Sequence, residues 1–513
     1  MPSFLTMRNS LLIPLASGIS AALLIIIITS KYGIGVSPDS ACYLSIAENL
    51  LKGNGYAIYD LEPAVAWPPL YPTLLAAAAI FKIEFEVWAR VFSSLLFGLI
   101  IFITTRKVMD QVSGWALAAV AIAGTVLSFP LMHIAKYAWS EPLFVFLVIL
   151  FLFRLEKSFK HHTWRDVMIL SILAALACLT RYIGVTLIIF YLLWLSLSKI
   201  EFRKKAAYAF VFLAVSLTPL AIWLIRNIRL TGNLTGERGE AATTFINNFL
   251  HAGDTVSIWF FPALVPADTR IILTGVFLIL AMAYYFRKSF KRIISDGFPQ
   301  VLLVNGGFTI VYVLYLLVVS SLVAFDQIHH RLLAPVYIPF LISLVFAADQ
   351  TVNHPDIGKS KTKFVASVLI LAWVGYLAYN TGVEINTDLR DGAGGYSSTF
   401  WQESDLAEYL SQNPPLVKTY SNYPDGLYVL SGVPASMAPR KHIYRSPDEP
   451  TQDIEKLQAE LQKTNNVCLA WFTSAKRGFL FEPEELQVSF DITILHEFSD
   501  GVLYKVSAKP PGV

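Results

Sequence analysis

Charged residues are scarce in this sequence. Of its 513 residues only 15% are charged and 55% are hydrophobic, whereas soluble domains carry about 25% charged residues. Mean hydropathy is +0.55, and uncharged apolar runs of about 20 residues, the length that crosses a bilayer as a helix, recur along the chain. This composition excludes a soluble enzyme, a nucleic-acid-binding protein and a disordered scaffold. It predicts a polytopic α-helical protein surrounded by membrane lipid.

Several common motifs of catalytic chemistry are also missing. The three cysteines, Cys42, Cys178 and Cys468, lie in different settings, so no disulfide framework is expected. No spacing of cysteine and histidine suits a metal ion. Gly392-Ala393-Gly394-Gly395 precedes no helical pattern, so we interpret it as a linker and not as a phosphate-binding loop. No cofactor is expected to be required, and the sequence does not support a divalent metal.

The few charges that are present divide the chain into two parts. Residues 380–513 contain 11 basic and 18 acidic residues, a net charge of −7, which leaves +10 for residues 1–379. The tail has the charged fraction of a soluble domain. Strand-like and helical patterns alternate in it, with turn signals between them, which predicts a small α/β domain. The strands are expected at 417–420, 467–472, 488–495 and 502–506, the helices at 400–410 and 454–461, and turns at 413–415 and 423–426.

The region 1–379 is predicted to span the membrane eleven times. The spans are expected at 11–29, 90–106, 115–131, 142–155, 167–180, 182–198, 207–225, 271–286, 301–323, 332–348 and 364–379. Lysine and arginine concentrate in alternate short loops, near 106–107, 154–165, 199–205, 287–292 and 359–363. The positive-inside rule places these loops, with Arg8 and the N-terminus, in the cytoplasm. The expected location is the plasma (inner) membrane, with two long outer loops, about 30–89 and 226–270, and an extracytoplasmic tail.

The first outer loop contains an acidic candidate, Asp39. Pro38 keeps the first span from continuing, and a helix follows that has Leu44, Ala47 and Leu51 on one face. Such a helix is expected to lie along the membrane surface. Asp39 is then either the N-cap of this helix or a catalytic base.

Glu141 is the second acidic candidate. It stands at the outer mouth of the fourth predicted span, in the sequence Ser140-Glu141-Pro142. A carboxylate at membrane depth is costly and usually faces a functional cavity. The alternative is an interfacial residue that caps a helix beginning at Pro142.

Three cations occupy outer loops that are otherwise poor in positive charge: Lys136, Arg181 and Arg331. The positive-inside rule disfavours cations there, and the guanidinium fork of arginine suits a phosphate. The alternative is that these side chains reach toward lipid headgroups. His329 and His330 lack partners at metal spacing and are interpreted as interfacial histidines, with His330 a weaker candidate for substrate contact.

Aromatic side chains gather around the same outer positions. Trp67, Tyr71, Trp139 and Tyr182 form the pattern of an outer aromatic belt. One or two of them could stack on a sugar. With Tyr43, which follows Asp39 by one helical turn, the residues Trp67, Tyr71 and Tyr182 are candidates for substrate contact.

These motifs, taken in order, resemble the GT-C glycosyltransferases, and especially the branch of aminoarabinose transferases and protein O-mannosyltransferases. The resemblance covers about residues 30–340. Its motifs are Asp39, Tyr43, Ala47, Leu50 and Gly53-Asn54-Gly55; Trp67-Pro68-Pro69-Leu70-Tyr71; Ala89-Arg90; Ser140-Glu141-Pro142-Leu143; Leu179-Thr180-Arg181; and Arg331-Leu332-Leu333-Ala334-Pro335-Val336-Tyr337. The chain departs from the family where Ser40 replaces a second acid and where Arg181 replaces the lysine that is frequent in the aminoarabinose branch.

The resemblance implies a polyprenyl-phosphate sugar donor and an inverting transfer to an acceptor hydroxyl of a lipid, glycan or protein at the outer membrane face. Asp39 would be the general base, Glu141 the second acidic residue of the site, and Arg181 and Arg331 would hold the donor phosphate. Two other classes remain open at this point. A transporter or flippase would also need charges at membrane depth, but it tends to place them near the midplane in paired halves. An anchoring protein would leave the outer charges unexplained.

Overall fold

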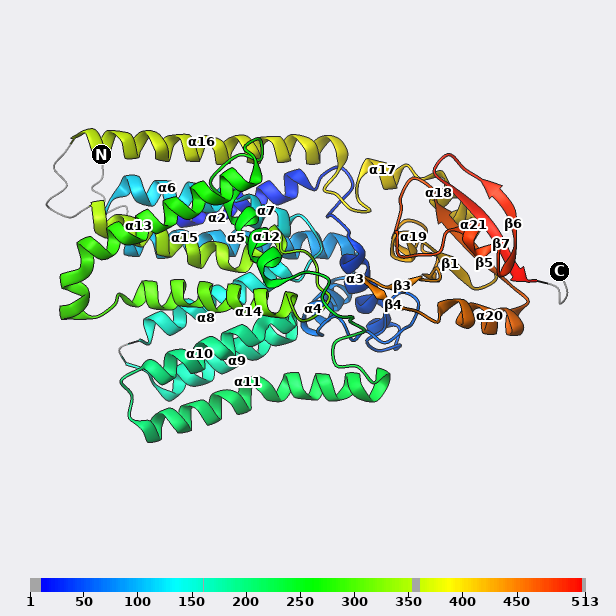
Figure 1. Cartoon of the computed structure of the whole chain (residues 1–513), viewed down its shortest axis with the longest axis horizontal. Helices are drawn as coiled ribbons and strands as arrows, with labels where there is room; N and C mark the ends of the chain where they lie inside the picture. Colours follow the sequence, from blue (N-terminus) through cyan, green and yellow to red (C-terminus); the bar gives the residue numbers. More distant parts are fainter. Residues whose placement is uncertain (1–10, 160, 353–359, 510–513) are drawn as a thin grey trace.

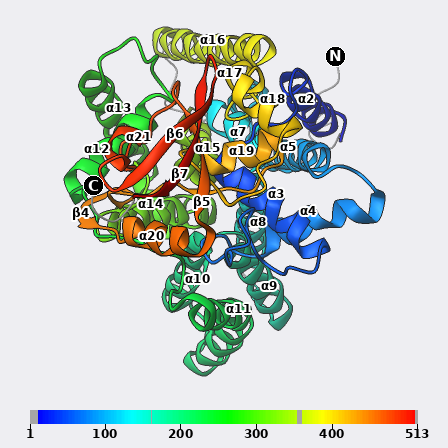
Figure 2. The same cartoon turned by 90° about the vertical axis from the view of Figure 1, so that its right-hand side faces the viewer.

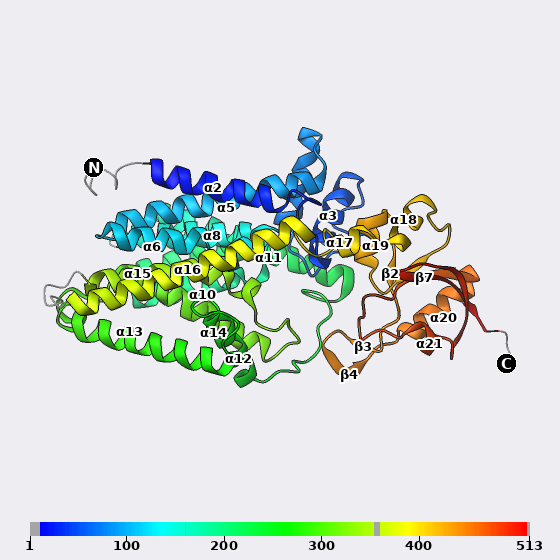
Figure 3. The same cartoon turned by 90° about the horizontal axis from the view of Figure 1, so that it is seen from above.

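The computed structural model describes residues 11–159, 161–352 and 360–509. Figure 1 shows a bundle of long helices and, at one end of it, a smaller domain that contains the sheet. The C-terminal domain lies at the end of the bundle away from the start of α2, as Figure 3 shows from above. Arg8, and the part of the predicted basic loop that lies at 353–359, are outside the described residues.

The bundle consists of helices that coincide with the predicted spans. They are α2 (Leu12–Ile28), α5 (Phe85–Gln111), α6 (Trp115–Val126), α7 (Phe129–Ala135), α8 (Glu141–Lys157), α9 (Trp164–Thr180), α10 (Val185–Leu197), α11 (Phe202–Thr231), α13 (Ala267–Asp296), α14 (Gly307–Ser320), α15 (His330–Val352) and α16 (Ser360–Asp391). Each of the eleven predicted segments overlaps a helix. Among the described residues, seven helical stretches are long and apolar enough to cross a membrane, so the count of eleven spans stays a prediction.

The bundle has one continuous apolar core, and its outer helices leave apolar side chains uncovered. On α13, for example, Ile272, Ile279 and Leu280 are each more than 60% exposed. A helix that carries isoleucine and leucine on its outer face suits a hydrocarbon environment, because lipid replaces the missing protein contacts. The polytopic membrane fold predicted from composition is therefore confirmed. The side of the membrane that each end faces stays a prediction.

The two long loops that are predicted to lie on the outer side contain short helices: α3 (Pro38–Leu51), α4 (Leu70–Ala76), the 3-10 helix η1 (Ala77–Phe81) and α12 (Phe245–Ser257). The prediction that α3 lies along the membrane surface is wrong. Its residues from Ser40 to Ala47 are all buried, whereas Leu51 is 52% exposed. Helix α3 is packed against α4 and α5 of the membrane part and against α19 of the C-terminal domain, so the domain covers the face that sequence assigned to solvent.

The C-terminal domain is a small α/β domain, as predicted. Its elements are α17 (Thr399–Gln402), α18 (Asp405–Gln412), β1 (Thr419–Ser421), α19 (Pro424–Ser431), β2 (Ser436–Met437), β3 (His442–Ile443), β4 (Ser446–Pro450), α20 (Asp453–Thr464), β5 (Asn466–Phe472), α21 (Pro483–Leu486), β6 (Phe490–Glu497) and β7 (Gly501–Ala508). The turn expected at 423–426 is instead the start of α19. The predicted boundary at 379/380 falls inside α16, which continues to Asp391.

The main sheet has strand order β2-β1-β5-β7-β6, parallel among the first three strands and antiparallel beyond β5. Alternate residues of β5 face opposite sides. Cys468, Ala470 and Phe472 pack with α18 and α19, whereas Val467, Leu469 and Trp471 pack with α20 and α21. Figure 2 looks onto this domain, with the bundle behind it.

Candidate functional site

Asp39 stands in the first turn of α3, but it does not cap the helix. The N-cap is Ser37, whose Oγ accepts a hydrogen bond from the backbone N–H of Ser40 at 3.3 Å. Pro38 occupies the first helical position, where its fixed φ and missing N–H fit best. The interpretation of Asp39 as an N-cap is therefore wrong, and its carboxylate extends across to other elements.

The other three charged candidates also lie at helix ends. Glu141 is the first residue of α8, after the N-cap Ser140, so the helix begins one residue before the expected Pro142. Arg181 is an extended residue between α9 and the short 3-10 helix η2 (Tyr182–Gly184). Arg331 is the second residue of α15. All four therefore lie at the end of the bundle that carries the C-terminal domain.

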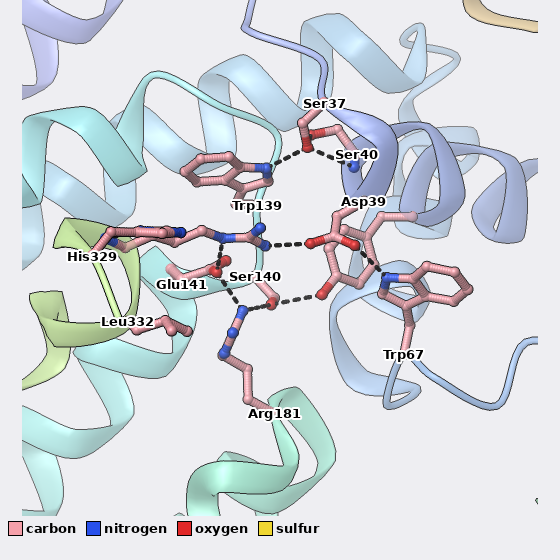
Figure 4. Close-up of polar contacts among 12 residues, drawn as sticks. Ser37, Asp39, Ser40, Trp67, Trp139, Ser140, Glu141, Arg181, His329 and Leu332 are labelled. Carbon is pink, nitrogen blue, oxygen red and sulfur yellow. Dashed lines mark hydrogen bonds and ion pairs between the residues drawn. The ribbon is translucent and has the colours of Figure 1, made fainter. Parts of the chain in front are cut away.

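Packing of α3, α8, α9 and α15 brings these four residues into one charged cluster (Figure 4). Arg331 Nη2 lies 2.7 Å from Asp39 Oδ2, and Arg331 Nε donates to Glu141 Oε1. Arg181 Nη1 pairs with the same Glu141 oxygen and donates to Ser140 Oγ at 3.3 Å. Two carboxylates and two guanidiniums balance in formal charge. Glu141, at 1% exposure, is the buried centre that joins the two arginines.

The Asp39 carboxylate is held in its ionised form. Burial by itself would favour the neutral acid, but Arg331 and a hydrogen bond from Trp67 Nε1 to Oδ1 at 3.0 Å outweigh it. The pKa of Asp39 is consequently lower than its ordinary value. A carboxylate has about four lone-pair sites, so these two contacts leave room for another donor.

Several residues around the cluster were not singled out as functional from the sequence. Arg331 lies over the Trp139 ring, 4.0 Å from its centroid, and Trp139 Nε1 donates to Ser37 Oγ at 2.6 Å. His329, and not the predicted His330, contacts Arg331, because its Nδ1 accepts a hydrogen bond from the backbone N–H of Arg331 at 3.1 Å. Ser140 joins Arg181 to Tyr43, whose OH lies 2.9 Å from Ser140 Oγ. Position within two residues of Glu141 or Arg331 in the sequence is the signal that could have indicated Trp139, Ser140 and His329.

Of the weaker substrate-contact candidates, only Tyr43 and Trp67 touch the cluster. Tyr71 is buried, with its ring edge-on to Tyr43. Tyr182 OH donates to Val65 O at 2.7 Å, which fastens the first outer loop to α11 through Trp223. His330 packs edge-on against Phe129. These last three side chains support the fold around the site and do not reach the four charges.

Lys136 is also separated from the cluster, because its partners are on α16. Its Nζ pairs with Glu384 and, at 2.6 Å, with Asp388. Lys136 is 5% exposed and Asp388 is 2% exposed. The candidate role of Lys136 in substrate contact is therefore replaced by a structural one, the attachment of α16 to the C-terminal end of α7.

The substitution Lys136→Met tests this assignment. It leaves two acidic side chains of α16 without their cation, and breaking a buried pair in this way costs about 3–5 kcal/mol. We expect a clear fall in the melting temperature in detergent, with less than a twofold change in the KM for a sugar donor. Lys456→Met, which removes an exposed ion pair with Asp453, should leave the melting temperature unchanged. A large rise in donor KM would return Lys136 to the substrate site.

No group of three or more histidine, cysteine, aspartate or glutamate side chains is placed to hold a metal ion within residues 11–159, 161–352 and 360–509. In the cluster, both carboxylates already pair with arginine. The expectation that catalysis needs no metal stays a prediction.

Comparison with solved structures defines the fold. ArnT from Cupriavidus metallidurans in the apo state superposes with a TM-score of 0.55 and 13% identity, over 95% of this chain and 97% of that one. The chain has the GT-C fold. ArnT bound to undecaprenyl phosphate superposes with the same TM-score and coverage at 14% identity. The archaeal oligosaccharyltransferase AglB from Archaeoglobus fulgidus gives a TM-score of 0.52 at 12% identity, covering 89% of this chain and 69% of that chain.

The arabinofuranosyltransferase AftD from Mycobacteria gives a TM-score of 0.51 at 12% identity, over 98% of this chain and 42% of that one. No family model matches the sequence, and no curated protein matches it. At sequence identities of 12–14%, the similarity to these solved structures shows a shared fold. The resemblance seen in the sequence motifs therefore predicted the GT-C fold correctly.

Proposed function

We propose that this chain is a membrane glycosyltransferase that moves a sugar from a polyprenyl-phosphate donor to an acceptor hydroxyl at the outer membrane face. The observation that carries the proposal is the convergence of Asp39, Glu141, Arg181 and Arg331 at the same end of a GT-C bundle. A base and two phosphate-binding cations are the groups that such a transfer needs.

The donor class is supported by chemistry and by the relatives. Two guanidiniums on one buried carboxylate can rotate toward a phosphate, for which arginine has matching geometry. One of the similar ArnT structures contains undecaprenyl phosphate, and the AglB structure contains a dolichol phosphate. A monophosphate-linked donor releases a leaving group whose charge two arginines can balance.

The reaction would proceed by a single displacement. The acceptor oxygen attacks the anomeric carbon from the face opposite the phosphate while its proton passes to Asp39. The bond from the anomeric carbon to the phosphate oxygen breaks, and the lipid phosphate leaves with the electron pair beside Arg181 and Arg331. This sequence inverts the anomeric centre. Glu141 positions both arginines through its Oε1, and its buried Oε2 has no hydrogen-bond partner among the described residues.

Arginine substitutions test the donor site. Hydrogen bonds to charged groups contribute about 1.5–3 kcal/mol, so Arg181→Gln and Arg331→Gln should each raise the KM for a polyprenyl-phosphate sugar by about 10- to 100-fold. Transfer of labelled sugar in proteoliposomes measures this effect. Arg229→Gln, which changes an exposed arginine of α11, is the control. Donor KM values that stay at the wild-type level in both site variants would refute the phosphate assignment.

A further inference from the structure

The glycine-rich segment interpreted as a linker is part of an ordered parallel arrangement. Tyr396 N donates to Val36 O at 2.7 Å, and Ser397 Oγ donates to Ile34 O at 2.7 Å. On the other side, Gly35 N donates to Lys136 O at 2.8 Å, and Ala138 N donates to Gly35 O at 2.9 Å. Residues 34–36 therefore lie between residues 136–138 and 394–397, with β-bridges on both sides. Asp39 follows this middle segment by three residues.

Glycine is required in the segment that follows α16. Gly394 and Gly395 have φ values of +106° and +59°, in the region that side chains disfavour. A Cβ on Gly395 would overlap the carbonyl oxygen of Val36, and a Cβ on Gly394 would overlap Tyr137 OH. The glycines let the backbone that leads into the C-terminal domain approach the residues before α3.

The same domain also contacts the far end of α3. Tyr428 of α19 donates a hydrogen bond from its OH to Glu48 Oε2. The Tyr428 ring stacks on Tyr59 of the first outer loop, with 5.6 Å between centroids. Glu48 lies in the last turns of α3, so the domain reaches the helix beyond its buried middle.

A buried network makes these two contacts part of one body. Tyr396 OH donates to Asp425 Oδ2 at 2.5 Å, and Arg477 Nη2 lies 3.0 Å from Asp425 Oδ1. Asp425 is 2% exposed and is on α19, the helix that carries Tyr428. Because this network joins Tyr396 to α19, the segment that contacts Val36 and the helix that contacts Glu48 belong to one packed unit.

We propose that the C-terminal domain positions Asp39 by holding α3 at both ends, with Gly395 and Tyr428 as positioning residues. The consequence for catalysis rests on the proposed function, whereas the hold on α3 is independent of it. Shifted away from its place, Asp39 would lose its contacts with Arg331 and Trp67, while its carboxylate would remain partly buried. Catalysis would then lose the aligned base although the donor site is intact.

The charged and titratable groups that face Asp39 come from several elements. They are Arg331 of α15, Arg181 after α9, Arg238 of the second outer loop, and Tyr43 and Cys42 of α3 itself. Arg331 is the largest favourable influence on the ionised form. Loss of its contact raises the pKa of Asp39, since burial then acts with less opposition. The acid limb of the pH profile of kcat should therefore move to higher pH.

The decisive experiment compares Gly395→Ala with Gly432→Ala in the full-length protein. Both glycines have positive φ, +59° and +72°, but a Cβ on Gly432 meets nothing within 4 Å. The two variants therefore share the strain of a side chain at positive φ, and only Gly395→Ala presses on Val36. Hydrogen exchange of the amides in α3 is measured first, in detergent and without substrate. We expect exchange at least tenfold faster in Gly395→Ala and unchanged in Gly432→Ala.

Kinetics give the second readout. In Gly395→Ala, kcat should fall about 10- to 100-fold, while the KM for the donor stays within twofold of wild type. The acid limb of the pH profile of kcat should shift to higher pH in this variant. None of these changes is expected in Gly432→Ala. Tyr428→Phe should produce the same changes to a smaller extent, and it decides the matter if Gly395→Ala does not fold. Tyr409→Phe, on α18 of the same domain, is its control.

Equal exchange of α3 in the two glycine variants would overturn the hold on the helix. An unmoved acid limb together with a reduced kcat would overturn the positioning of Asp39. If the wild-type protein transfers no sugar from any polyprenyl-phosphate donor, the proposed function fails, and the exchange data still decide the hold on α3.

Discussion

Asp39→Asn is expected to lower kcat for sugar transfer by about 1,000-fold, because general base catalysis typically contributes 10²–10⁴. The amide keeps the shape of the side chain and still accepts a hydrogen bond from Trp67 or Arg331, but it cannot take up the acceptor proton. Donor KM should change far less than kcat, since the arginines stay next to Glu141. Initial rates in proteoliposomes that contain a polyprenyl-phosphate sugar measure both constants.

Controls separate lost chemistry from lost folding in this experiment. Expression and melting temperature of Asp39→Asn should remain near wild type, because the half-exposed carboxylate is at the edge of the cluster. Asp60→Asn changes another acid of the first outer loop and should retain activity. Wild-type turnover in Asp39→Asn would rule out Asp39 as the base and direct attention to Glu141.

Glu141→Gln should have the largest effect on stability. Glu141 is the common partner of Arg181 and Arg331, so its neutralisation leaves two partly buried guanidiniums with only the Asp39 carboxylate. Loss of one partner from a buried charged network costs about 3–5 kcal/mol. Thermal unfolding in detergent should show a strong decrease, and donor KM should rise because the arginines lose their orientation. Glu86→Gln, at an exposed glutamate of α5, should unfold like the wild type.

A double-mutant cycle distinguishes charge imbalance from a packing defect. Glu141→Gln combined with Arg181→Gln removes one charge of each sign, and the double variant should be more stable than the sum of the single effects predicts. The expected coupling is about 1–3 kcal/mol, within the range for residues of one network. Strict additivity would mean that Glu141 contributes through packing alone.

The proposed hold on α3 gives the C-terminal domain a specific role. Helix α19 of this domain packs against α3, and the contacts of the domain with residues 34–36 and Glu48 connect it to the proposed base.

Much of the fold was predictable because the responsible signals are local. Apolar runs of a given length indicate helices wherever they occur, and every predicted span overlaps one. The cap of α3 was mispredicted because both Ser37 and Asp39 can accept the capping hydrogen bond. Pro38 decides between them, since it fits the first helical position. The surface position of α3 was mispredicted because the cover on its polar face is an element almost 400 residues away in the sequence.

The candidate site also divides into residues that the local sequence indicated and contacts that it did not. Each of Asp39, Glu141, Arg181 and Arg331 was indicated by its own position, because a charge at the mouth of a span is costly unless it has a use. Lys136 met the same criterion and yet belongs to another network. Its partners on α16 lie 248 and 252 residues along the chain, and no periodicity or spacing of residues indicates such a pair.

By itself, the sequence determined the membrane character of the protein, the positions of its helices, the separate α/β domain and the end of the bundle where unusual charges gather. These properties depend on composition and on hydrophobic runs within about twenty residues. Only the tertiary structure decided that Glu141 joins both arginines, that Lys136 anchors α16, and that a glycine segment holds the residues before Asp39. Those contacts join elements that are distant in the chain, and they form only when the helices pack and exclude water from the charges between them.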